Sequence, residues 1–280
     1  EYAEISHAFA YGFLEFGLQR EAKVITVMNN RPEWNFVDMG TALAGVVHVP
    51  VYSTLSDDDY RYIIPHSDAK IIIIGSAILY KHIAPVIAGL ENPPTVFTID
   101  NVEGVNNLDQ IRRMGVENKE KWAPVIEENK KTITPDTLLS IIYTSGTTGT
   151  PKGVMHAHSS IVFNFLAHAA QQIKNSSHRY LSFLPLCHIY ERTMNYEFQS
   201  LGISIYYGEN MGTIARDLKD IQADGFCAVP RVIEMMYKKL DDIGKSLTGF
   251  KKIIYRWAWN FGNTFDYENL TFRRRLLNSL

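Results

Sequence analysis

The sequence predicts an α/β protein built on doubly wound, mostly parallel sheets with flanking helices. Short apolar runs of the kind found in buried strands alternate with helix patterns along the chain, and their connections are short. One of these runs, Leu138–Ile142 (LLSII), is short and continuously apolar, which is typical of a parallel strand covered on both faces. In folds of this class, ligands are expected at the carboxyl ends of the strands.

The first alternating series opens with a helix that Gly17 ends. The apolar face of this helix comprises Ile5, Phe9, Phe13 and Phe16. The strands expected next are Val24–Met28, Val46–Tyr52, Lys70–Ile74, Thr95–Ile99 and Leu138–Ile142. Helices are expected from about Pro32, from Ser56 with Asp59 completing a capping box, and over Leu79–Leu90. The polar residues 101–137 are expected to form a helix-containing excursion.

A second alternating series follows a helix over Ser159–Ile173. Its expected strands are Tyr180–Leu184, Ile203–Tyr207 and Phe226–Val229, and its expected helices are Tyr190–Leu201, Ile214–Ala223 and Val232–Leu247. A boundary between two sheet subdomains is expected near residues 174–178 (KNSSH), with a first subdomain over 1–175 and a partial second one over 176–280. Because the chain opens inside a helical pattern without Met and stops after RRRLLNSL, we expect a piece of a longer protein.

Composition excludes several classes of protein. The chain has 280 residues, of which 46% are hydrophobic and 21% charged, enough for a substantial core. A formal net charge of −2 argues against a nucleic-acid binder that relies on bulk positive charge. Two cysteines, Cys187 and Cys227, are too few for a disulfide framework, so a cytoplasmic location is expected. No apolar run reaches the ~20 residues of a membrane span.

The loop after Leu138–Ile142 has the composition of an anion-binding loop. It reads YTSGTTGTPKG (143–153) and combines glycines, threonine and serine hydroxyls and one lysine with no acidic side chain. A Walker A loop is excluded, because Gly-Lys-Ser/Thr does not follow Gly146 at the required distance. The dinucleotide fingerprint G-x-G-x-x-G occurs nowhere in the chain.

Strand, loop and following helix together resemble the phosphate loop of the adenylate-forming superfamily, which includes acyl-CoA synthetases, firefly-type luciferases and the adenylation domains of peptide synthetases. Three further segments resemble the N-terminal part of long-chain fatty acyl-CoA synthetases: VMNNRPEWNFVDMGTALAGVVHVPVYSTLS (27–56), LPLCHIYERTM (184–194) and VPRVIEMMYKKL (229–240). The E-R after H-I-Y is typical of the long-chain branch.

The resemblance implies an AMP-forming ligase. ATP would activate a long-chain fatty acid to an acyl adenylate, and coenzyme A would then take the acyl group, giving acyl-CoA, AMP and pyrophosphate. The residues implied at the β- and γ-phosphates are Thr144, Ser145, Gly146, Thr147, Thr148 and Gly149, with Lys152 ordering the loop or neutralising the leaving group. Mg²⁺ is implied as a bridge between phosphates, with Thr144 as its ligand. A second acidic ligand, the adenine and ribose contacts and a mobile carboxy-terminal domain would follow Leu280.

The resemblance also implies a role for His188, beside the substrate carboxylate and the α-phosphate. Tyr190 and Arg192 follow at the start of a helix, where they are expected to line the entrance of an acyl tunnel. His156 and His158 have H-x-H spacing, but without a third ligand nearby a capping or packing role is favoured over zinc.

Residues 250–265 (FKKIIYRWAWNFGNTF) are rich in aromatic and basic side chains. The pattern favours a buried amphipathic helix with Ile254, Trp257 and Phe261 inward over a helix at a membrane surface, although a peripheral membrane contact stays open. Two other functions also stay open: another acyl-activating ligase, acting on an acyl-carrier protein or an aryl acid, and a non-catalytic nucleotide-binding module. The 280-residue chain alone is expected to be inactive, and its oligomeric state cannot be predicted.

Overall fold

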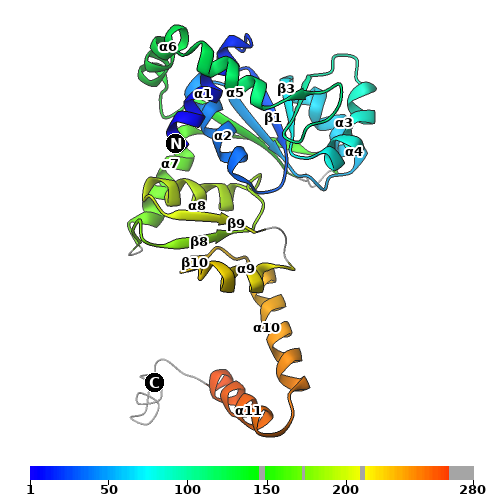
Figure 1. Ribbon diagram of the computed structural model, residues 1–280, viewed down its shortest axis with the longest axis vertical. Coiled ribbons are helices and arrows are strands. Elements are labelled where there is room, and N and C mark those ends of the chain that lie inside the picture. Colours follow the sequence, from blue (N-terminus) through cyan, green and yellow to red (C-terminus); the bar gives the residue numbers. More distant parts are fainter. Residues whose placement is uncertain (145–148, 172–173, 209–211, 265–280) are drawn as a thin grey trace. The chain divides into compact units, whose positions relative to one another are not determined.

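The computed structural model describes residues 1–144, 149–171, 174–208 and 212–264. The chain divides into two compact units, Glu1–Cys227 and Ala228–Leu280. The described strands all belong to the first unit, where they form two sheets (Figure 1).

The larger sheet has seven strands in the order β5-β4-β3-β1-β2-β6-β7. Their bounds are β1 (Lys23–Val27), β2 (Val47–Val51), β3 (Ala69–Ile74), β4 (Thr95–Thr98), β5 (Asn106–Asn107), β6 (Leu138–Thr144) and β7 (Lys152–Ala157). Every neighbouring pair is parallel except β6 and β7. After β2 the chain crosses back over β1 to form β3, so the sheet is wound in both directions from β1, as the sequence predicts.

Helices cover both faces of this sheet. One face carries α1 (Tyr2–Glu15), α2 (Pro32–Ala44), α5 (Asp109–Glu117) and α6 (Lys119–Thr132), whose core includes Phe13, Trp34 and Ile111 packed on Ile71 and Ile73. The opposite face carries α3 (Asp57–His66) and α4 (Ala77–Ala88), which pack on Ile72 and Ile74. Alternate isoleucines of β3 therefore enter two different cores, which explains why KIIII shows no polar alternation.

Local signals in the sequence mark the helix ends and crossings. Ser56 caps α3 and completes the predicted capping box with Asp59. Where α1 crosses α5, a Cβ on Gly115 would lie 1.8 Å from the carbonyl oxygen of Ala8. Only glycine permits that approach, so this position fixes how close the two helices lie.

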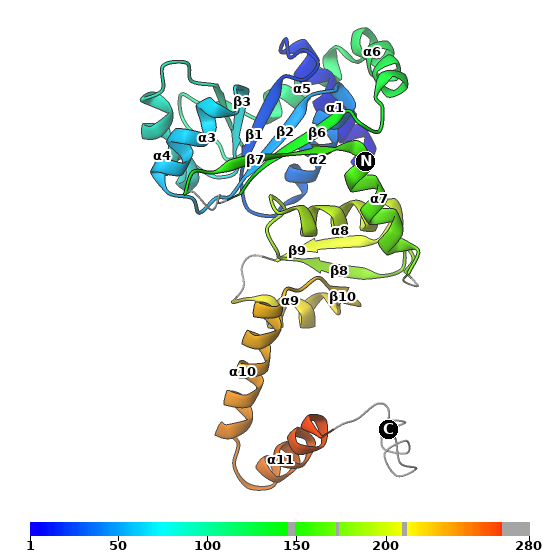
Figure 2. The same ribbon diagram turned by 180° about the vertical axis from the view of Figure 1, so that it is seen from behind.

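The smaller sheet has three parallel strands in the order β10-β8-β9. The strands are β8 (Arg179–Ser182), β9 (Ser204–Tyr207) and β10 (Gly225–Phe226); α8 (Ile189–Ser200) connects β8 to β9, and α9 (Ile214–Ile221) precedes β10. Helix α7 (His158–Ala169) packs against α8 (Figure 2). The predicted α/β class is thereby confirmed. The expected boundary near residues 174–178 falls between the two sheets, and as a subdomain boundary it stays a prediction.

One strand contradicts the sequence prediction. The phosphate loop was expected to lead directly into a helix, but β7 lies between them and pairs antiparallel with β6 (Figure 2). Val154 and Met155 on β7 are 42% and 73% exposed. An edge strand with so little burial lacks the apolar pattern that reveals a strand in the sequence.

The second unit contains α10 (Pro230–Ser246) and α11 (Gly249–Asn263). Tyr255 and Trp259 face α10: the Tyr255 hydroxyl donates to Asp241 at 3.0 Å, and the Trp259 ring lies 4.7 Å from that of Tyr237. The prediction of a buried helix is wrong, since no residue of α11 is buried and the expected inward residue Trp257 is 57% exposed. Among the described residues, no helix is long and apolar enough to cross a membrane.

Candidate active site

Two of the predicted phosphate-site residues stand at the base of the same hairpin. Thr144 is the last residue of β6, Lys152 is the first of β7, and the two are directly paired across the strands. Opposed side chains in such a pair lie ~5 Å apart at their Cβ atoms. Both are exposed. The hairpin therefore presents a hydroxyl and an ammonium together at the carboxyl end of β6.

The loop between them lies only partly within the described residues. Ser145, Gly146, Thr147 and Thr148 lie outside them. Gly149 has φ = +85°, in the left-handed region that favours glycine.

Packing around β6 orients the hairpin. The Tyr143 hydroxyl lies 2.7 Å from His66 Nδ1 on α3, which ties the end of β6 to the neighbouring helix. A Cβ at position 153 would lie 2.8 Å from the Ile141 side chain, so Gly153 allows the two strands to pack closely just beyond Lys152.

His188 occupies the N-cap of α8. Its Nδ1 accepts a hydrogen bond from the backbone N–H of Tyr190 at 3.3 Å, and the side chain is exposed. In the neutral imidazole, Nε2 then carries the proton and can donate to an oxygen anion. Tyr190, on the first turn of the same helix, is 40% exposed.

Arg192 lies inside the molecule, one helical turn further on. Its Nε and Nη2 donate to the two carboxylate oxygens of Asp38 on α2, at 3.1 and 2.5 Å, and its Nη1 donates to Ser140 Oγ on β6 at 2.6 Å. The side chain is fully buried. The prediction that Arg192 lines the entrance of an acyl tunnel is therefore wrong, because a buried guanidinium that is bonded to a carboxylate cannot contact a fatty acid.

Asp38 is the centre of a buried polar network. Besides Arg192, it accepts from His48 Nδ1 at 2.6 Å and from the Tyr196 hydroxyl at 2.7 Å. Burial by itself raises the pKa of the Asp38 carboxyl, but Arg192, His48 and Tyr196 outweigh burial and lower this pKa to about 2. Burial lowers the pKa of His48 more than Asp38 raises it, so His48 is neutral at pH 7.

The network joins α8 to the larger sheet. His48 on β2 also reaches Thr26 Oγ1 on β1 at 2.8 Å, and Ser140 Oγ donates to the His48 carbonyl oxygen at 2.7 Å. Three strands of the larger sheet (β1, β2 and β6) and helix α2 are thus connected to Arg192 and Tyr196 of α8. Since His188 begins that helix, the network also fixes where His188 lies.

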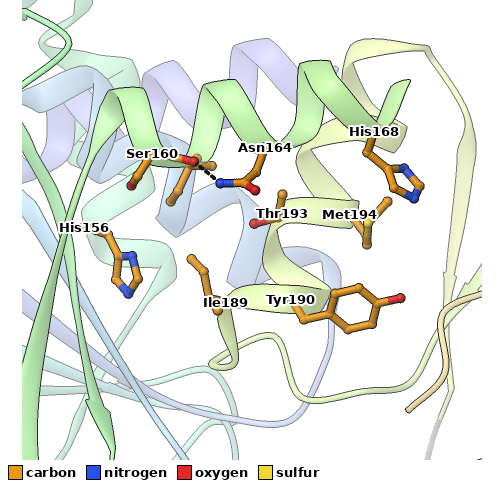
Figure 3. A pocket seen from close by; sticks show the side chains of 9 residues that line it. His156, Ser160, Asn164, His168, Ile189, Tyr190, Thr193 and Met194 are labelled. Atoms are coloured by element: carbon orange, nitrogen blue, oxygen red, sulfur yellow. Dashed lines mark hydrogen bonds between the residues drawn. The ribbon is translucent and has the colours of Figure 1, made fainter. Parts of the chain in front are cut away.

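A cavity of about 360 Å³ lies between α7 and α8 (Figure 3). Its lining residues come from three elements: His156 from β7; Ser160, Ile161, Asn164 and His168 from α7; and Ile189, Tyr190, Thr193 and Met194 from α8. The Asn164 amide donates to the Ser160 carbonyl oxygen at 2.6 Å. Burial first, and then Arg192, lowers the pKa of His156, so this wall of the cavity is uncharged at pH 7. Mostly apolar walls with a few polar groups are typical of small-molecule sites.

The cavity brings the hairpin and α8 together. His156 follows Lys152 on β7, and Tyr190 follows His188 on α8, and both His156 and Tyr190 line the same cavity. The pocket is thus bounded by the two elements on which the sequence places the phosphate and carboxylate contacts.

Almost the whole described chain matches one family in sequence. Residues 1–262 match the family model described as AMP-binding enzyme. The chain belongs to the AMP-binding enzyme family. For this family, use of ATP is implied.

Several curated proteins are similar to this AMP-binding enzyme chain. Long chain acyl-CoA synthetase 6, peroxisomal, of Arabidopsis thaliana is 29% identical over 267 residues, covering 90% of this chain and 37% of the relative. Long-chain-fatty-acid–CoA ligase ACSBG1 of Rattus norvegicus is 26% identical over 281 residues, covering 92% of this chain and 37% of the relative. The chain therefore spans 37% of the length of these two relatives.

Solved structures share the fold. The N-terminal domain of FACL13 from Mycobacterium tuberculosis, in an inhibitor-bound crystal structure, has a TM-score of 0.66 at 22% identity, covering 84% of this chain and 56% of that one. A Mycobacterium tuberculosis fatty acyl CoA synthetase has a TM-score of 0.67 at 21% identity, covering 84% of this chain and 44% of that one. The two-sheet α/β fold of this AMP-binding enzyme chain is thus also that of acyl-CoA ligases.

Sequence reasoning missed the buried network of this AMP-binding enzyme. The sequence analysis predicts Asp38 only as part of a helix, and His48 and Ser140 only as parts of strands. The available signal was a polar residue inside an otherwise buried apolar strand, as in VHVPV and LLSII, because such a group requires a hydrogen-bond partner. The roles expected of Thr144, Gly149, Lys152, His188 and Tyr190 remain predictions.

Proposed function

We propose that this chain takes part in the ATP-dependent activation of a long-chain fatty acid, followed by transfer of the acyl group to coenzyme A. The products would be acyl-CoA, AMP and pyrophosphate. Membership of the AMP-binding enzyme family supports the use of ATP. The two curated relatives, whose names specify long-chain acyl-CoA synthesis, support the acid and the thiol.

The cavity between α7 and α8 is the observation that carries the fatty-acid assignment. Ile161, Ile189 and Met194 give it apolar walls suited to an alkyl chain. None of the nine described lining residues is acidic, so none would pair with the ammonium of an amino acid. Because Ile189 and Tyr190 at the start of α8 line the cavity, the carboxylate of a bound acid would lie toward His188 in this proposal.

In the first step, a carboxylate oxygen would attack the α-phosphorus of ATP and pyrophosphate would leave. Both reactants are anions, so fixed donors at the developing charge lower the barrier. Lys152 would stabilise the leaving pyrophosphate, and His188 Nε2–H would donate to an oxygen of the carboxylate or the α-phosphate. Backbone N–H groups and hydroxyls of residues 144–149 would hold the β- and γ-phosphates.

Thr144 also fits a metal-binding role. It ends β6 at an exposed position and offers a hydroxyl oxygen, the type of ligand that Mg²⁺ combines with phosphate oxygens and water. Mg²⁺, when bound, would neutralise phosphate charge.

The test is fatty-acid-dependent ATP–pyrophosphate exchange by the full-length protein with palmitate. We expect Thr144→Ala and Lys152→Ala to slow exchange on the order of 10²–10³-fold, since each would remove one of the groups proposed to contact the phosphates or their metal ion. Lys81→Ala, at an exposed lysine of α4, is the matched control and should leave the rate unchanged. Near-native exchange in both Thr144 and Lys152 variants, with unchanged melting temperatures, would contradict the phosphate-site assignment.

A further inference from the structure

The segment just before His188 is held by one side chain from the loop between β1 and α2. Asn30 follows β1, and its Nδ2 donates to the Leu184 carbonyl oxygen at 2.7 Å while its Oδ1 accepts from the Leu186 N–H at 3.0 Å. A single carboxamide therefore satisfies a donor and an acceptor two residues apart, as a neighbouring strand would. Because these two bonds are to the backbone, they set the path of the chain whatever side chains Leu184 and Leu186 carry. Asn30 Nδ2 also donates to Ser182 Oγ at 3.4 Å.

The segment after His188 is held from a second direction. The Arg192 N–H donates to the His188 carbonyl oxygen at 3.2 Å in the first turn of α8, and the Arg192 guanidinium is fixed to Asp38 on α2. Before the helix, the His188 N–H donates to the Pro185 carbonyl oxygen at 2.9 Å. This bond closes a turn between the residues held by Asn30 and the start of α8. His188 thus lies in a short stretch with one anchor before it and one after it.

These anchors leave the imidazole little freedom to move relative to the larger sheet. Because Nδ1 of the ring accepts a hydrogen bond from the Tyr190 N–H, Nε2 is the ring nitrogen that remains to donate to a substrate. Losing either anchor lets the turn shift, and a displacement of 1 Å at a reacting group can cost on the order of 10² in rate.

We propose that Asn30 is a positioning residue for His188, holding residues 184–186 so that the imidazole meets the carboxylate and the α-phosphate. The inference rests on the proposed function and extends it to a residue that lies outside the phosphate loop and the α8 helix.

Asn30 is a better test position than Arg192. Arg192 is a fully buried charge whose removal lowers the stability of the whole unit, whereas Asn30 is uncharged and partly exposed. Asn30→Ala removes both backbone bonds and also the 3.4 Å bond from Asn30 Nδ2 to Ser182 Oγ. Asn30→Asp keeps an oxygen acceptor for the Leu186 N–H but places a second oxygen against the Leu184 carbonyl. Asn29→Ala is the matched control, because Asn29 accepts a bond of similar length, 2.8 Å, from Ser53 Oγ.

The experiment measures ATP–pyrophosphate exchange with palmitate in the full-length protein, for Asn30→Ala and Asn29→Ala in the wild-type and His188→Ala backgrounds. We expect Asn30→Ala to lower kcat about tenfold or more with little change in the KM for ATP, and to cause less than about a threefold further loss once His188 is gone. Asn29→Ala should stay within about twofold. Thioester formation from supplied acyl adenylate should be spared in Asn30→Ala.

A role that is only structural gives a different pattern. If the Asn30→Ala loss is undiminished in the His188→Ala background, or if the exchange rate does not fall at all, the positioning role is overturned. Asn30→Asp should not restore the wild-type rate, because its second carboxylate oxygen would repel the Leu184 carbonyl oxygen. A wild-type rate in Asn30→Asp would count against the hydrogen bond to Leu184 as a positioning contact.

Amide hydrogen exchange separates this inference from the proposed function. In the 280-residue chain, Asn30→Ala should speed exchange at the Leu186 amide by tenfold or more, and Asn29→Ala should not. Absence of fatty-acid-dependent turnover in the wild-type protein would refute the proposed function, and with it the catalytic role of Asn30. An unchanged exchange rate at the Leu186 amide in Asn30→Ala would instead refute the claim that Asn30 holds residues 184–186.

Discussion

Replacing Arg192 by methionine should destabilise the first unit severely. The side chain is fully buried, and each of its three guanidinium nitrogens donates one hydrogen bond, two to Asp38 and one to Ser140. A pKa of about 2 for Asp38, against the ordinary value of 3.8, corresponds to about 2 kcal/mol of net stabilisation of the carboxylate. Without Arg192 that stabilisation is lost while the cost of burial remains. We therefore expect a loss of about 3–5 kcal/mol in the free energy of unfolding at pH 7.

The effect of Arg192→Met should depend on pH in a defined direction. In the wild type the pKa of Asp38 is depressed, so its contribution is present above about pH 3.8 and is lost as the pH falls toward 2. In the variant, burial is no longer outweighed and the pKa of Asp38 should rise. Protonation then relieves the buried charge, so the difference in stability between variant and wild type should shrink between pH 7 and pH 4.5.

The assay is urea unfolding of the 280-residue chain followed by far-UV circular dichroism at both pH values. Arg61→Met is the control, because Arg61 forms an ion pair of 2.6 Å with Asp58 but is 58% exposed. Its loss should cost at most about 0.5 kcal/mol. A loss below about 1 kcal/mol for Arg192→Met, or a difference that widens at pH 4.5, would refute the assignment of Asp38 and Arg192 as a stabilising buried pair.

Three further predictions concern single positions. Ser56→Ala should lower the free energy of unfolding by about 1 kcal/mol, measured by urea unfolding, because it removes the N-cap of α3; an unchanged midpoint would contradict the capping role. Gly115→Ala should lower the free energy of unfolding by about 1–3 kcal/mol or more in the same assay, since its Cβ would lie 1.8 Å from the Ala8 carbonyl oxygen. Gly89→Ala is the control and should be almost neutral, because the nearest atom to its Cβ would be 3.6 Å away. Equal effects of the two substitutions would refute the crowding at Gly115. His188→Ala in the full-length protein should reduce adenylation more than thioester formation from supplied acyl adenylate, and equal losses would indicate a structural histidine.

The central strands were predictable from the sequence because burial on both faces leaves an unmistakable apolar run. The predicted Lys70–Ile74 became β3 (Ala69–Ile74), and the predicted Val46–Tyr52 became β2 (Val47–Val51). The edge strand β7 was not predictable in this way, because its side chains are largely exposed and its sequence therefore lacks a continuous apolar run.

The predicted site was only partly within reach of the sequence. The loop and His188 lie in continuous sequence motifs, so the sequence alone was enough to propose them as site residues. The contact between Asp38 and Arg192 joins residues 154 apart in the chain, and that between Ser140 and Arg192 joins residues 52 apart. Such pairs are created by the packing of elements that are distant in the sequence. From the sequence alone, Arg192 is therefore expected to line a tunnel entrance with Tyr190.

The most direct test of the proposed function is the acid preference of the full-length protein, measured as AMP formation with ATP, Mg²⁺ and coenzyme A. Palmitate or oleate should support AMP formation far better than acetate, benzoate or amino acids, because the cavity beside α8 offers apolar walls and, among its described lining residues, no carboxylate. A preference for acetate, benzoate or an amino acid would contradict the long-chain assignment and leave only membership of the AMP-binding enzyme family.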